Sequence, residues 1–290
     1  MLFKKVYNGC SITKKENNVK KLILGALFSI PTLTSAFPLC AYNLDATPSE
    51  ISNYILGGRV PEKFPILDGQ SYGYKVLARN NTSNDSKLYV AGSSKFINDI
   101  VAWNNADNSK EADLQGDVVL QDSGVYAFEY KINSFPYSTL SSNSKLSLGS
   151  MIVGTSNNRK SVHIITTLSN ASPSTGFQFK IEIIDKEAST YYPFVYNFPY
   201  ELTNFRYGLY FNQDTKQIGL IFNGVNKGYL RTLTSKIDSL GIILQGESNG
   251  GNNIDGTIGK TISGGLVTDK TQFKYFYPIT TKDICGNRLR

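Results

Sequence analysis

One stretch, residues 205–230, restricts the fold of this chain more than any other. Apolar residues alternate with polar or small ones over residues 205–212 and again over 217–222, which is the period of a half-buried β-strand. The dipeptide Asn223-Gly224 follows and favours a type I′ hairpin turn, whose two central residues both adopt positive φ. Antiparallel strands with a single apolar face need a second layer to cover that face. The stretch therefore predicts a β-sandwich.

The rest of the chain carries short strand-like runs separated by polar turns. They include residues 95–103 and 272–277, and Tyr, Phe and Gly are abundant at 18, 16 and 25 residues. This pattern is typical of all-β domains. A single short helix is expected after Thr47, which suits an N-cap and precedes Pro48.

We therefore predict an all-β fold, an antiparallel two-sheet, jelly-roll-like sandwich with one short N-terminal helix. Residues 37–290 are expected to form a single domain, with a helical and loop segment at residues 37–70. An outer-membrane barrel is the alternative, because its strands also alternate. Barrel strands are about ten residues long, and many of the runs here are shorter.

The beginning of the chain has the layout of a secretory signal. Two lysines precede an apolar run at residues 22–33, and small residues follow it up to Ala36. The run is too short to span a bilayer, so we expect no transmembrane span after cleavage. Residues 19–36 are interpreted as a signal peptide, and residues 1–18 as an upstream extension from a misplaced translation start. The expected location is the periplasm or the outside of the cell.

Charge argues against a nucleic-acid partner. The formal net charge is +7, but residues 1–36 contribute +5 through six lysines and one glutamate, so the remainder carries only +2. A nearly neutral mature chain lacks the basic character that binding to phosphate backbones requires.

Two cysteines, Cys40 and Cys285, lie beyond the leader. An even pair in an exported protein predicts a disulfide, which here requires the two ends of the domain to be neighbours. Two free thiols or a redox pair are the alternative. The chain has one histidine and no Cys-x-x-Cys motif, so we predict no transition-metal site.

Two segments resemble parts of SPRY-type domains. Residues 124–130, GVYAFEY, resemble the SPRY strand with Gly, two aromatics, Glu and an apolar residue, and residues 207–224 resemble a later strand–turn–strand segment ending in Asn-Gly. The wider concanavalin A-like group shares this core. The resemblance covers about residues 115–245, although the chain lacks the Trp of the aromatic-Glu strand. It implies a jelly-roll-like sandwich whose loops bind peptide or glycan, normally without catalysis.

Residues 40–47, CAYNLDAT, resemble the mature start of an uncharacterised family of exported Gram-negative bacterial proteins, a domain of unknown function. That resemblance implies no known activity.

No convincing catalytic set emerges from the sequence. The lone histidine, His163, lies in an alternating strand without a Gly-x-Ser-x-Gly elbow elsewhere. Glycoside hydrolysis needs two carboxylates facing each other across a cleft. The best acidic cluster places Glu182 and Asp185 on opposite faces of a strand. We therefore predict that the chain is not an enzyme.

Aromatic and loop residues are the candidate ligand contacts. Tyr192, Tyr196 and Tyr200 fall on one face of a strand that Pro193 and Pro199 mark as an edge strand. The same ring faces could instead belong to the core. The other candidate contacts are Trp103 beside two asparagines, and Asn252 and Asp255 in a flexible loop with possible calcium ligands.

These observations predict an exported, non-catalytic binding or structural module that recognises glycan or peptide through the loops of a sandwich. Apart from possible calcium, no cofactor is expected. A secreted carbohydrate-active hydrolase on the same fold and a surface- or pilus-associated interaction protein are the alternatives.

Overall fold

The computed structural model describes residues 39–55, 58–77, 86–105, 114–136, 145–156, 160–172, 176–198, 205–249 and 257–290. They belong to one compact unit that begins at Leu39. The predicted extension at 1–18 and signal peptide at 19–36 lie outside the described residues. So do three of the candidate contacts, which are Tyr200, Asn252 and Asp255.

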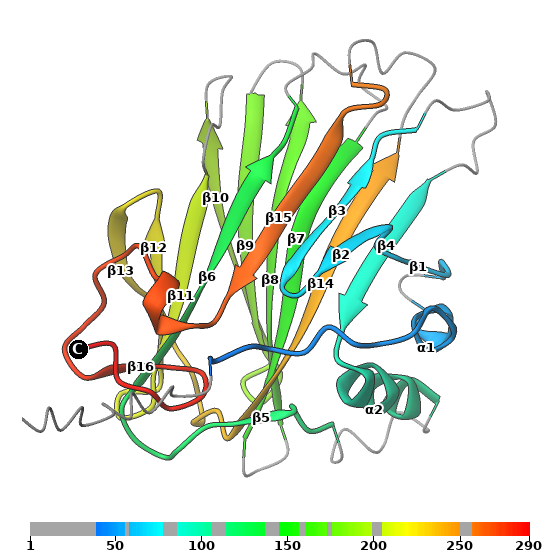
Figure 1. The fold of residues 1–290 in the computed structure, drawn as a ribbon. Coiled ribbons are helices and arrows are strands. Elements are labelled where there is room, and N and C mark those ends of the chain that lie inside the picture. The colour runs from blue at the N-terminus through cyan, green and yellow to red at the C-terminus, as the bar shows by residue number, and fades with distance from the viewer. Residues whose placement is uncertain are drawn as a thin grey trace, which may run out of the picture. The chain divides into compact units, whose positions relative to one another are not determined.

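Two sheets make up the unit, and Figure 1 shows the sheet with β6 and β15 lying over the sheet with β7, β8 and β14. The first sheet runs in the order β1 (Glu62–Lys63), β4 (Lys87–Gly92), β14 (Ser239–Asn249), β7 (Lys145–Thr155), β8 (Ser161–Ser172), β9 (Gly176–Asp185) and β10 (Thr190–Phe198), with β5 (Val118–Val119) beside β14. The second runs in the order β13 (Val225–Thr232), β12 (Gln217–Phe222), β11 (Arg206–Asn212), β6 (Val125–Ser134), β15 (Thr261–Val267), β3 (Ser71–Lys75) and β2 (Ile66–Asp68), with β16 (Thr281–Asp283) beside β6.

All strand pairs are antiparallel except β1 with β4 and β16 with β6. The predicted all-β, two-sheet antiparallel sandwich is confirmed.

The central hairpin also forms as predicted. Tyr207 on β11 pairs with Phe222 on β12, and the turn that follows has φ of 48° at Asn223 and 81° at Gly224. The ring of Tyr207 is 2% exposed and stacks on Tyr130 with 4.9 Å between ring centroids. The alternating apolar face of residues 205–222 therefore lies in the core between the sheets.

Helix α1 (Pro48–Asn53) begins as the sequence predicts. Thr47 caps it, and Glu50 completes a capping box by accepting the Thr47 backbone N–H at 2.7 Å. The structure describes no helix long and apolar enough to cross a membrane.

Two predicted strands are wrong. Residues 95–103 lie in a second helix, α2 (Ser94–Asn105). Phe96, Ile97 and Ile100 share one face of this helix, and that face packs against the first sheet. The Ser93 hydroxyl accepts the Phe96 backbone N–H at 3.0 Å, as an N-cap does. Of residues 272–277, the first ends a short 3₁₀ turn, η2 (Lys270–Gln272), and the others form no strand.

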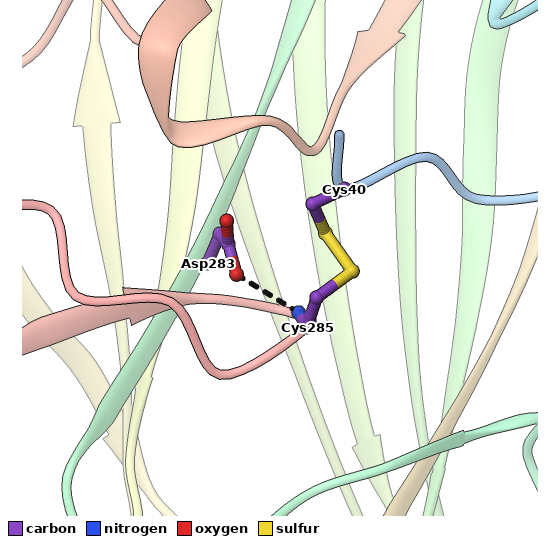
Figure 2. Close-up of side chains that lie close together, drawn as sticks. All are labelled: Cys40, Asp283 and Cys285. Carbon is purple, nitrogen blue, oxygen red and sulfur yellow. Dashed lines mark hydrogen bonds between the residues drawn. A yellow bond between two sulfur atoms is a disulfide. The ribbon is translucent and has the colours of Figure 1, made fainter. Parts of the chain in front are cut away.

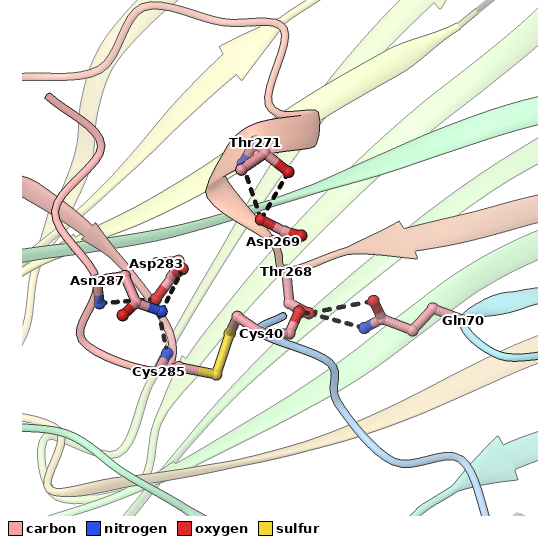
Figure 3. Close-up of a disulfide and its surroundings, with 8 residues drawn as sticks. All are labelled: Cys40, Gln70, Thr268, Asp269, Thr271, Asp283, Cys285 and Asn287. Carbon is pink, nitrogen blue, oxygen red and sulfur yellow. Dashed lines mark hydrogen bonds between the residues drawn. A yellow bond between two sulfur atoms is a disulfide. The ribbon is translucent and has the colours of Figure 1, made fainter. Parts of the chain in front are cut away.

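The predicted disulfide is confirmed. Cys40 and Cys285 are bonded, with 5.7 Å between their Cα atoms (Figure 2). Close by, the Thr268 hydroxyl donates to the Cys40 carbonyl at 2.7 Å and contacts the Gln70 amide (Figure 3). Asp283 accepts the Cys285 N–H at 3.0 Å, which fixes the turn that carries the second sulfur. The bonded sulfurs provide no thiolate for a metal ion.

Candidate functional site

The predicted aromatic row lies on β10, at the edge of the first sheet. Tyr192 and Tyr196 are half-buried and pack against the core. The Tyr196 ring stacks on Phe222 at 4.8 Å, and the Arg231 guanidinium lies 3.8 Å from the centre of the Tyr192 ring. These rings cover the side of the core between β10 and the opposite sheet. Their packing therefore agrees with the alternative that the row belongs to the core. Ligand contact by them stays a prediction.

Trp103 lies in the last turns of α2. It is half-buried and packs against the apolar cluster beneath the two helices, as Met151 and Val101 also do. The ring is therefore at the rim of a core.

The acidic cluster of β9 divides between two faces, as predicted. Lys180 pairs with Glu182 at 2.8 Å on the outer face of the first sheet. Asp185 faces inward, is 3% exposed, and accepts the backbone N–H and the hydroxyl of Thr234, both at 3.0 Å. These two carboxylates cannot act on one bond. The His163 ring contacts the Ser161 hydroxyl at 3.0 Å.

The centre of the second sheet holds a buried carboxylate. Glu129 on β6 is fully buried and forms an ion pair with Arg206 of the neighbouring strand β11. It also accepts the backbone N–H groups of Lys274 at 3.1 Å and Tyr275 at 3.0 Å, and the Tyr277 hydroxyl at 3.1 Å. Burial, followed by the charge of Glu129, raises the pKa of Tyr277, so its hydroxyl remains a donor. Glu129 therefore anchors residues 268–290, the C-terminal segment, over the outer face of the sheet.

Apolar packing completes this attachment. Phe273, Tyr275 and Tyr277 of the C-terminal segment pack on a small cluster of the sheet that includes Tyr210. Gly208 allows the close approach, because a Cβ there would lie 2.0 Å from the Tyr277 hydroxyl oxygen.

A hollow of about 480 Å³ opens where the C-terminal segment meets the end of β6 and the β12–β13 turn. We call it the basic cup. Its lining comes from four parts of the chain: Lys131, Ile132, Asn133, Phe205, Arg206, Asn223, Gly224, Lys274 and Tyr275.

Charge in the basic cup is one-sided. Arg206 is balanced by Glu129 and also donates to the Gln272 carbonyl at 2.7 Å. Among the described residues, Lys131 and Lys274 form no ion pair. The Lys131 stem lies beside Gly265, where a Cβ would be 2.7 Å from the lysine Cε. The stem of Lys131 therefore packs over β15. Burial raises the pKa of Tyr275 to about 12, so the cup presents a neutral phenol.

A second hollow, of about 270 Å³, brings two carboxylates together. We call it the acidic hollow, and its lining includes Asp45, Asp117 and Tyr42. The Tyr42 hydroxyl donates to Asp117 at 2.9 Å and accepts the Ile242 backbone N–H at 2.9 Å. Burial, together with the charge of Asp117, raises the pKa of Tyr42 and keeps it protonated. Asp45 accepts the Ser94 N–H at 2.8 Å, at the start of α2.

Neither hollow was identified from the sequence. The one signal available was Glu129, a carboxylate in the middle of an otherwise apolar strand run, which is a pattern typical of a buried, partnered acid. Lys131 and Lys274 lie so far apart in the sequence that their presence in one hollow could not be predicted.

Several solved structures are similar to this chain at low identity. A glycoside hydrolase family 16 endo-glucanase from Bacteroides ovatus is 12% identical, with a TM-score of 0.33, and the match covers 53% of this chain and 70% of that one. The CBM40 of a Ruminococcus gnavus IT-sialidase, bound to α2,3-sialyllactose, is 18% identical, with a TM-score of 0.28 and coverage of 50% and 75%. An alginate lyase from Pseudomonas aeruginosa is 10% identical, with a TM-score of 0.35 and coverage of 68% and 78%. No curated protein matches the sequence significantly.

These structures correct the prediction that the chain is not an enzyme. Glycoside hydrolases and a lyase are among the proteins that it resembles. The lack of a familiar catalytic motif in the sequence is therefore no ground for excluding catalysis.

The sequence also matches a family model, over residues 20–287. The match agrees with the resemblance of residues 40–47 to a family without known activity, while export stays a prediction. This chain belongs to the family described as a domain of unknown function, DUF4882.

Proposed function

We propose that this protein recognises an acidic carbohydrate in the basic cup. The observation that carries the proposal is the charge of the cup, because Lys131 and Lys274 face a hollow of about 480 Å³ without an acidic partner among the described residues. A carboxylate or sulfate on a sugar supplies the missing charge. The volume is in the range typical of sites for small ligands, about 300–1,000 Å³.

The other groups of the cup suit a sugar. Tyr275 offers a half-buried ring, whose hydroxyl donates to the Arg206 backbone carbonyl, and the exposed Asn223 offers an amide that both donates and accepts. The proposal extends the predicted glycan ligand by fixing the sign of its charge. It presumes export to the periplasm or the cell exterior.

Binding to matched acidic and neutral oligosaccharides tests the proposal. The mature protein should bind uronate, sialylated or sulfated oligosaccharides more tightly than neutral ones, and less tightly as salt rises. An exposed ion pair contributes about 0.5–1 kcal/mol, so Lys131→Gln with Lys274→Gln should weaken binding about five- to thirtyfold.

The matched control is Lys75→Gln with Lys186→Gln, which removes the same charge from two lysines outside the cup and without ion pairs in the described chain. Equal binding of acidic and neutral sugars, or an equal loss in both double variants, contradicts the proposal.

A second candidate function is glycoside hydrolysis at the acidic hollow. It is favoured by one observation, that Asp45, Asp117 and the protonated Tyr42 line the same hollow. Two carboxylates across a cleft are the groups that hydrolysis of a glycosidic bond requires. If hydrolysis occurs there, new reducing ends should appear with a glycan substrate, and Asp117→Asn should abolish them while leaving binding in the basic cup unchanged. Release by the Asp117→Asn variant at the original rate rejects this candidate.

A further inference from the structure

A third hollow adjoins the basic cup. It has a volume of about 350 Å³ and lies within the C-terminal segment, and we call it the tail hollow. Lys270, Phe273, Tyr277 and Arg288 are among its lining residues. Tyr275 lines both the tail hollow and the basic cup, so the two hollows share this residue.

The tail hollow is also basic at its surface. The Lys270 ammonium donates to the Arg288 carbonyl at 2.8 Å, which holds the two cationic residues together, and Arg288 itself is exposed. Two acids of the segment, Asp269 and Asp283, are only 5% and 0% exposed. Asp283 accepts backbone N–H groups of its own turn, and Asp269 caps η2 by accepting the Thr271 N–H at 2.8 Å. Arg288 and the half-buried Lys270 therefore lie nearer the solvent than the two buried aspartates.

The two hollows lie within the reach of one ligand chain. Lys270 and Lys274 are four residues apart, so their Cα atoms are separated by at most about 14 Å even in a fully extended backbone. A ligand with a charged group on each of several linked units can contact both lysines at once. A single acidic sugar in the cup leaves the cations of the tail hollow without a partner.

We propose that the ligand is an acidic polysaccharide with charge on successive sugars, and that it lies across Tyr275 from the basic cup into the tail hollow. This inference rests on the proposed function, since it takes the basic cup as the first binding site. Nucleic acid is the other extended polyanion with rings and charges at regular intervals. The net charge of only +2 outside residues 1–36 favours the polysaccharide, because binding to phosphate backbones draws on a stronger basic excess.

Occupation of two adjacent hollows makes affinity depend on ligand length, because binding in the second hollow becomes intramolecular once the first is filled. Oligogalacturonates of one to eight sugars are suitable probes, measured by titration calorimetry with the oxidised, full mature chain. Affinity per molecule should rise about tenfold or more between the dimer and the hexamer and then level off.

Variants of the two hollows separate the steps. Lys270→Gln with Arg288→Gln should bind the dimer as the native chain does but lose the rise with length. Lys131→Gln with Lys274→Gln should weaken binding at every length, and Lys75→Gln with Lys186→Gln should behave as native. Arg288→Gln alone keeps the Lys270 hydrogen bond to the backbone, and it should lose part of the rise without any change in thermal midpoint.

The outcomes distinguish the two proposals. If the native chain binds no acidic sugar of any length, the proposed function itself fails. If it binds the dimer and hexamer equally, or if the rise survives in the Lys270→Gln, Arg288→Gln variant, only the extended site is overturned. If a single-stranded oligonucleotide binds more tightly than an oligogalacturonate of equal charge, that result identifies the ligand as a nucleic acid and overturns the proposed polysaccharide site.

Discussion

Replacement of Glu129 by alanine removes the acceptor on which the C-terminal segment is anchored. The native carboxylate is fully buried and receives hydrogen bonds from Arg206, Lys274, Tyr275 and Tyr277. The Arg206 side chain is only 14% exposed, so the substitution leaves a largely buried guanidinium without its counter-charge. Loss of one partner from such a pair costs about 3–5 kcal/mol. Glu129→Gln keeps one carbonyl acceptor and should cost less.

Urea-induced unfolding with the disulfide intact measures this cost. With a slope of about 3 kcal/mol per molar urea, Glu129→Ala should lower the midpoint by about 1–1.7 M. Hydrogen exchange gives the local readout, because the amides of Lys274 and Tyr275 donate to the carboxylate and should lose protection before the strands do.

A double-mutant cycle with Arg206→Met supplies the control. Removal of both charges leaves no unpaired ion, so the double variant should be more stable than the sum of the single effects implies. A loss below about 1 kcal/mol in Glu129→Ala, or additive effects in the cycle, would refute the role of Glu129 as the anchor.

Three further predictions concern other contacts of the fold. Cys40→Ser with Cys285→Ser opens a loop of 245 residues, and the loss of unfolding free energy in urea should approach the roughly 5 kcal/mol of the loop-closure model; an unchanged midpoint contradicts it. Gly208→Ala places a methyl group 2.0 Å from the native position of the Tyr277 hydroxyl and should cost about 1–3 kcal/mol by thermal unfolding, a native midpoint being the contrary result. The pKa of Glu50 is lowered to about 2, first by the Ser94 hydroxyl, so its contribution is complete above pH 4.5 and lost as pH falls toward 2; Glu50→Gln should flatten that part of the stability curve, and identical acid profiles would oppose this assignment.

Local patterns predicted the parts of the fold that short segments determine. Alternation around Tyr207 and the turn at Asn223-Gly224 fixed one hairpin, and its single apolar face required the second sheet. The strand predicted at residues 95–103 is wrong, because a helix packed on a sheet also buries only one apolar face. The spacing of Phe96, Ile97 and Ile100 places these three side chains on one face of a helix.

The candidate sites depend on contacts between distant segments, and this is why the sequence did not show them. The basic cup joins β6, the β12–β13 turn and residues near Lys274. Total charge concealed it, since the cations of the cup are balanced by acids elsewhere in the chain. The role of Glu129 was hidden for the same reason, because its partners in the C-terminal segment follow it by 145 residues or more.

The position of β16 has a consequence for biosynthesis. This strand pairs in parallel with β6 in the middle of the second sheet, although β16 is synthesised long after β6. A nascent chain that stops short of residue 274 lacks both this strand and the C-terminal groups that donate hydrogen bonds to the buried carboxylate on β6. Long-range pairing of this kind slows folding and delays cooperative closure. The second sheet can therefore be completed only after its last strand has been synthesised.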